Sequence, residues 1–124
     1  MTQQELLFFD ALPGMLPVYA QLRERILAAC PGTQVRVSKT QISFRGRYLF
    51  AMVSLPRRRM KTPQEEHIIV SFGLGYEVQS ERIFATAQPA PRRRTHHVAV
   101  HNAADADDEL MGWIVEAYGF AQNK

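Results

Sequence analysis

Apolar residues near the N-terminus recur every three or four positions, which is the spacing of helices with one buried face. The first segment, "TQQELLFFDALP", opens with Thr2 and Glu5 at capping-box spacing and ends at a proline followed by glycine. The second segment, "LPVYAQLRERILAACPG", also ends in a proline-glycine pair. Its apolar stripe comprises Val18, Leu22, Ile26 and Ala29. The pattern therefore predicts two N-terminal helices.

From residue 33 the apolar residues change to a period of two, which indicates β-strands. The predicted strands are 33–37, 40–44, 48–55, 67–72, 81–86 and 95–100. Strand 48–55 is apolar on both faces, as expected of a central strand that is covered on both sides. Because no helical segment separates these strands, they favour an antiparallel sheet.

Helical spacing returns in the C-terminal segment "DADDELMGWIVEAYGFAQNK". Its apolar face comprises Leu110, Met111, Ile114, Ala117, Tyr118 and Ala121. We expect Asp105 to cap the helix, and we interpret the acids that follow it as partners of the helix dipole rather than as a divalent-cation site.

The predicted fold is a single α+β domain over residues 1–124, with a curved, mainly antiparallel sheet of five or six strands. The C-terminal helix packs on one face, and the N-terminal helices cover an edge or the other face. A hydrophobic content of 46% and a charged content of 22% are ordinary for such a domain.

The longest relevant apolar run, 48–53, is far shorter than the roughly 20 residues of a membrane-crossing helix. The N-terminus has no basic leader before its apolar residues, and the single cysteine, Cys30, cannot form an internal disulfide. These features predict a cytoplasmic protein without a membrane partner.

Positive charge is concentrated in the segments 56–61 and 91–94 of a chain with a net charge of +3 and a sequence pI near 9.4. Such clusters suit an anionic partner, although solvated loops have the same composition. Both interpretations stay open at this point.

The segment "PRRRTHHVAVHN" combines arginine and histidine at the start of the last predicted strand. Alternation places Arg94 and His96 on the face that Val98 and Val100 turn to the core, so we expect them at the rim, with His96 partly shielded. His97 and His101 share the opposite face but lie about 13 Å apart in an extended chain, too far to hold one zinc ion together. We therefore expect neither a metal nor a cofactor.

No catalytic residue set is recognisable. Cys30 is expected at the end of a helix, where the dipole opposes a thiolate, and the serines lie in no nucleophile-elbow context. We therefore predict a small non-catalytic binding module whose ligand is an organophosphate, a carboxylate or a nucleic-acid backbone. The predicted ligand-binding residues are Lys39, Arg45, Arg94 and His96. The alternative is an enzyme with unlocated acid–base residues on the same sheet face, and the oligomeric state stays open.

Three stretches in this order, "VSKTQISFRGRYLFAMV", "PRRRTHHVAV" and "DADDELMGWIVEAYGFA", resemble the bacterial domain-of-unknown-function family 5655 over residues 19–121. The resemblance implies a domain that occurs alone or joined to other modules, some labelled predicted transport proteins, and it implies no catalytic residues. The element order is also similar to the frataxin-like α-β sandwich. Frataxins bind iron through an acidic helix, whereas the corresponding helix here has a single acid, Glu24, so we expect no iron role.

Overall fold

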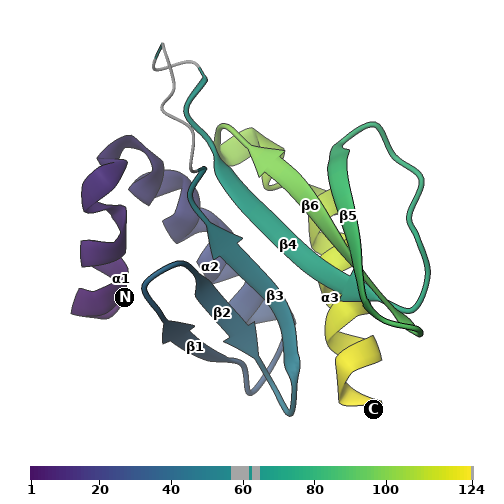
Figure 1. The fold of residues 1–124 in the computed structure, drawn as a ribbon. Coiled ribbons are helices and arrows are strands. Elements are labelled where there is room, and N and C mark those ends of the chain that lie inside the picture. The colour runs from purple at the N-terminus through teal and green to yellow at the C-terminus, as the bar shows by residue number, and fades with distance from the viewer. Residues whose placement is uncertain (57–61, 63–64, 124) are drawn as a thin grey trace.

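One antiparallel sheet forms the centre of this computed structural model, which describes residues 1–56, 62 and 65–123 (Figure 1). Its six strands within the described residues are β1 Gln34–Val37, β2 Ile42–Arg45, β3 Leu49–Ser54, β4 Ile68–Leu74, β5 Ile83–Ala90 and β6 Arg93–Val100. The spatial order is β1-β2-β3-β4-β6-β5, and every neighbouring pair is antiparallel. The predicted fold class and the predicted type of sheet are confirmed.

The two long helices lie on one side of this sheet. α1 Gln3–Phe8 is followed by the short 3-10 helices η1 Phe9–Ala11 and η2 Pro13–Met15, then α2 Leu16–Ala29; η4 Ala103–Asp105 precedes α3 Asp108–Gln122. Figure 1 shows α2 and α3 behind the sheet and α1 beyond the β1 edge. We call the face that packs against α2 and α3 the covered face and the opposite one the open face.

The hydrophobic core lies between the covered face and these two helices. The sheet contributes Phe44, Phe72 and Val98, and each is at most 1% exposed. The predicted stripe of α3 is confirmed, since all of its residues are buried except Tyr118, which is partly buried. Strand 48–55 was expected to be covered on both sides, and this is wrong: Met52 and Ser54 of β3 are half-exposed on the open face.

A buried carboxylate attaches α1 to α2. Glu5 is fully buried, and it accepts hydrogen bonds from the Tyr19 hydroxyl and from Arg23 Nε at 2.6 Å. Burial raises the pKa of this carboxyl, but the hydrogen bonds from the Thr2 backbone, Tyr19 and Arg23 outweigh burial and hold the pKa below its usual value. The predicted capping box of Thr2 and Glu5 is confirmed. A six-residue helix has little stability of its own, so this contact fixes its position.

The cap of the C-terminal helix differs from the prediction. Asp107, not Asp105, is the N-cap of α3, and its side chain accepts from Leu110 N at 3.0 Å. Asp105 ends η4 instead, where its carboxylate accepts from the backbone N–H of His101 at 3.0 Å. The extra 3-10 turn explains the shift, because it occupies the residues that the predicted helix would have used first. Within the described residues, no helix is both long and apolar enough to cross a bilayer.

Candidate functional site

His96 is a core residue rather than a rim residue. It is fully buried on the covered face, its ring stacks on Phe72 with centroids 5.0 Å apart, and Phe72 in turn stacks on Trp113 of α3 at 5.6 Å. Its Nε2 accepts from the backbone N–H of Val78 at 2.9 Å, so the ring proton is assigned to Nδ1. Nδ1 has no hydrogen-bond partner among the described residues. The expectation of a partly shielded, ligand-facing histidine is therefore wrong, because α3 closes over this part of the sheet.

The other predicted ligand residues are spread over the sheet. Arg94 pairs with the buried Leu74 and lies on the covered face with His96, as the alternation predicted. Arg45 pairs with Gln34 and belongs to the open face, and Lys39 lies in the turn between β1 and β2, at the other end of β2. The structure thus brings Arg94 and His96 onto one face and separates them from Lys39 and Arg45. The basic residues of 57–59 and 61 lie outside the described residues.

One row of paired residues, most of them polar, crosses the open face. Each residue of the row pairs in register with the next, from β1 through to β5. The row comprises Arg36, Ser43, Met52, Ser71, His97 and Ala85. Among the described residues no helix lies over this row (Figure 1). Arg36 and Ala85 are exposed, Ser43, Met52 and His97 are partly exposed, and Ser71 is buried.

Two hydrogen bonds order the side chains on this face. Gln41 Nε2 donates to Ser43 Oγ at 3.1 Å, and Ser71 Oγ lies 2.6 Å from His97 Nδ1. Burial, and then the charge of the neighbouring His96, lower the pKa of His97 below its usual value of 6.5. The imidazole is therefore neutral at neutral pH. We assign the donor role to the Ser71 hydroxyl, which has no other partner in the described part of the chain, and this leaves the Nε2–H of His97 as a donor.

Three hollows on the open face join into a trough. A hollow of 890 Å³ lies between α1 and the β1–β2 turn, a second of 290 Å³ lies over His97, and a third of 370 Å³ lies beside His67 and His101. The first two share Gln41, Ser54 and Ile69 in their walls, and the second and third share Phe84. The trough therefore runs across the strands from α1 to the β5 edge.

Unpaired arginines lie on the open face, beside this trough but not in its walls. Arg36 and Arg45 belong to the open face by register. Arg93 also lies there, because its Nε is 3.2 Å from the position that a Cβ on Gly73 would occupy, on the side of β4 opposite Phe72 and Leu74. A glycine at this position leaves room for the guanidinium to lie against the sheet. Within the described residues these three arginines make no hydrogen bond or ion pair, and β1 to β6 contain no aspartate or glutamate.

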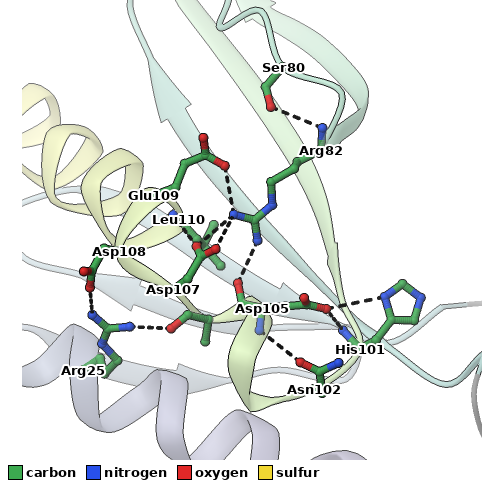
Figure 2. A network of polar contacts seen from close by, with 11 residues as sticks. Arg25, Ser80, Arg82, His101, Asn102, Asp105, Asp107, Asp108, Glu109 and Leu110 are labelled. Atoms are coloured by element: carbon green, nitrogen blue, oxygen red, sulfur yellow. Dashed lines mark hydrogen bonds and ion pairs between the residues drawn. The ribbon is translucent and has the colours of Figure 1, made fainter.

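Two arginines pair with the acidic residues at the start of α3 (Figure 2), and one of them, Arg82, lines the far end of the trough. Arg82 donates to Asp107 at 2.8 Å, to Glu109 at 3.0 Å and to the Asp105 carbonyl at 2.7 Å. Arg25 of α2 reaches Asp108 at 2.6 Å. The acidic cluster thus serves capping and ion pairs, which confirms its interpretation as helix-start chemistry. Among residues 1–56, 62 and 65–123, no group of three or more potential ligands is arranged to hold a metal ion.

Sequence reasoning missed Arg36, Ser71, Arg93 and His97 as site residues. A signal for His97 was present, because the alternation that sends Val98 to the core sends His97 to the opposite face. What the sequence did not reveal was that α2 and α3 cover the same face, which makes the face of His97 the accessible one.

The chain matches a family described as Domain of unknown function (DUF5655) over residues 8–121. No curated protein and no solved structure matches it.

Proposed function

The chain belongs to the DUF5655 family, whose description names no activity, and we propose that it is a non-catalytic binding module that holds an anionic ligand on its open face. The single observation that carries the proposal is the set of unpaired arginines, Arg36, Arg45 and Arg93, on a face whose strands contain no carboxylate. A guanidinium offers several donors in a fixed fork, which suits phosphate and carboxylate groups.

The hydrogen-bonding groups beside the arginines support the same function. The Nε2–H of His97 and the amide of Gln41 offer donors along the trough. These neutral donors hold a ligand in position, while the arginines supply the charge. The ligand classes that remain are the organophosphate, the carboxylate and the nucleic-acid backbone expected from the sequence.

A hydrolase is the second candidate, because a serine hydroxyl lies 2.6 Å from a histidine whose pKa is lowered. Two observations favour binding over catalysis. Among the described residues no carboxylate is hydrogen-bonded to His97, so the imidazole lacks the usual orienting group. The backbone N–H groups around Ser71 lie in an antiparallel ladder between β3 and β6, where they are unavailable to stabilise an oxyanion.

An NMR titration with pyrophosphate, a compact polyanion, tests the proposal. We expect millimolar binding that weakens with salt, with shifts near Arg45 and His97. Arg45→Gln should weaken binding, and Arg94→Gln is the matched control, because Arg94 is equally half-exposed but lies on the covered face.

The absence of pyrophosphate binding, or an equal effect of Arg94→Gln, would contradict binding at the open face. Labelling of Ser71 by a fluorophosphonate that is lost in His97→Gln would instead favour the hydrolase.

We also infer a reducing compartment, and specifically the cytoplasm, for this protein. The single cysteine, Cys30, is fully buried, and burial raises the pKa of its thiol, so it behaves as a core residue rather than as a disulfide partner. Detection of the protein in the cytosolic fraction of its host cell tests this inference.

A further inference from the structure

We infer that the anion is a single-stranded nucleic acid, which lies across the strands with its phosphates over Arg36, Arg45 and Arg93 and its bases in the trough. This inference rests on the proposed function of the open face and names the class of its ligand. The geometry that points to it is the position of three arginines beside a trough whose far end is lined by aromatic and histidine rings.

Arg36, Arg45 and Arg93, which we call the arginine border, lie beside the trough on the open face and outside its walls. Arg45 lies two residues beyond Ser43 on β2, which is about 7 Å along an extended strand, and the Arg93 guanidinium lies over β4 at the same end of the sheet. Arg36 is on the neighbouring strand β1. From β1 to β4 there are three strand spacings of about 4.8 Å each, so the three cations extend over roughly 14 Å. This length exceeds one phosphate group and suits several phosphates of one backbone.

Planar side chains gather at the β5 and β6 end of the trough. Phe84 of the edge strand β5 is 57% exposed, and a register shift between Ile83 and Ala85 turns it to the open face. Its ring lies 6.2 Å from the ring of His97, and the rings of His67 and His101 lie 5.0 Å apart beside the adjoining hollow. An exposed phenylalanine with a histidine next to it is a stacking surface for unpaired bases, which every base can use.

The charges on the open face favour one placement of such a strand. Glu81 and Asp105 line the hollow at the far end of the trough; Arg82 lines it too, but its guanidinium is already paired with Asp107 and Glu109, so the carboxylates there disfavour phosphate. The arginine border has no carboxylate on its strands, so the phosphates are directed to the arginines and the bases to the planar side chains at the far end. An acidic peptide would use the arginines but would gain little from the planar side chains.

A single strand fits the open face better than a duplex. Sequence-reading contacts to a duplex require an element that enters a groove, whereas the planar side chains here lie on a sheet face, where unstacked bases can lie against them. A compact anion would occupy one arginine and leave the trough empty. The trough crosses from β2 to β5, over four strand spacings or about 19 Å, which requires an elongated ligand.

Fluorescence anisotropy with labelled single strands tests this inference. The probes are an oligouridylate and an oligothymidylate of about eight nucleotides, within the site sizes of sheet-based single-strand binders, and a duplex of the same length. Oligoglutamate of similar length and pyrophosphate are the competitors. The RNA and DNA arms distinguish the two sources of the same backbone chemistry.

We expect a single strand to bind more tightly than the duplex and than pyrophosphate. With three phosphates contacted, the slope of log affinity against log salt should be about −2. Each of Arg36→Gln, Arg45→Gln and Arg93→Gln should make this slope less steep by about 0.7. Arg94→Gln, on the covered face, should leave the slope unchanged.

Phe84→Ala should weaken binding about fivefold to a hundredfold without changing the slope. Tyr76→Ala removes an aromatic of similar exposure that is hydrogen-bonded to Glu116 outside the trough, and it should have no effect.

The outcomes separate this inference from the proposed function. If pyrophosphate binds but single strands bind no more tightly, or if Phe84→Ala is silent, the ligand is a compact anion and the inference fails while the proposed function stands. Tighter binding of the duplex or of oligoglutamate also overturns the inference alone. If neither pyrophosphate nor any longer polyanion binds, both proposals fail.

Discussion

The adjacent residues His96 and His97 have opposite environments because a strand turns successive side chains to opposite faces. His96 is buried, its ring stacks on Phe72, and its Nε2 accepts a hydrogen bond from the backbone N–H of Val78. His97 lies on the open face, where its ring contacts Ser71 and Phe84. One residue therefore contributes to the core and its neighbour to the candidate site.

The lowered pKa of His97 makes stability depend on pH. Burial and then His96 favour the neutral imidazole in the folded chain, so the unfolded chain binds a proton at a higher pH, near 6.5. Stability should therefore fall as the pH decreases through about 6.5 and level off below the folded pKa. Urea midpoints at about pH 7.5 and 5.5 should show a smaller decrease for His97→Gln than for the wild type. The exposed His101 provides the control variant His101→Gln, and an unchanged decrease in His97→Gln would contradict this assignment.

The depth of a residue was less predictable than the face to which it points. Alternation correctly placed His96 with Val98 and Val100, because the period of two is a local property of the strand. Alternation does not reveal which helix lies above a given pair of strands. His96 stacks on Phe72, which in turn stacks on Trp113 of α3, and that packing joins residues far apart in the sequence.

At the scale of elements, the position of α2 decides where a ligand can bind. The helical stripe of α2 and the strand alternation were both readable from the sequence. Of the predicted stripe, Val18, Leu22 and Ile26 are buried, whereas Ala29 at the end of the helix is exposed. The sequence allowed α2 to cover either an edge or the second face. It packs beside α3 instead, where Arg25 joins the two helices through Asp108, and the second face stays open. Hydrophobic periodicity does not reveal an ion pair between segments far apart in the sequence. The face of the sheet that stays accessible could therefore not be assigned from the sequence.

Helix α3 supplies most of the cover of the central strands, so truncation of its buried side chains should destabilise the domain. Leu110 and Ile114 are fully buried, and Leu110→Ala and Ile114→Ala should each lower the free energy of unfolding by about 2–5 kcal/mol, since each leaves a cavity. Val115 of the same helix is 41% exposed, and Val115→Ala is the matched control, with an expected loss under about 0.5 kcal/mol. Chemical denaturation measures all three variants. Equal losses at buried and exposed positions would be incompatible with this packing.

At the scale of the whole molecule, the described arginines differ in whether they have an acidic partner. Arg23, Arg25 and Arg82 form ion pairs that attach helices and the β4–β5 connection to one another. Arg36, Arg45 and Arg93 lie on the open face without a described acidic partner. Composition showed only that the chain is basic, because the net charge does not distinguish arginines that form ion pairs within the fold from arginines that have no acidic partner. The structure separates paired from unpaired arginines, and Arg36, Arg45 and Arg93 are the unpaired ones that we place on the open face.

This division predicts that the open-face arginines contribute to binding and not to stability. Cations without partners on one face repel each other, and salt screens that repulsion. The triple variant Arg36→Gln, Arg45→Gln and Arg93→Gln should therefore unfold at the same or a higher temperature than the wild type at low ionic strength. Salt should raise the melting temperature of the wild type more than that of the variant, because the variant has less charge repulsion for salt to screen. Differential scanning calorimetry at low and high sodium chloride measures both effects.

Arg82→Gln is the control from the paired group, and it should destabilise the domain because it leaves Asp107 and the Asp105 carbonyl without their partner. If the triple variant loses more than about 1 kcal/mol of stability, beyond the usual effect of surface substitutions, these arginines support the fold and their availability to a ligand is refuted.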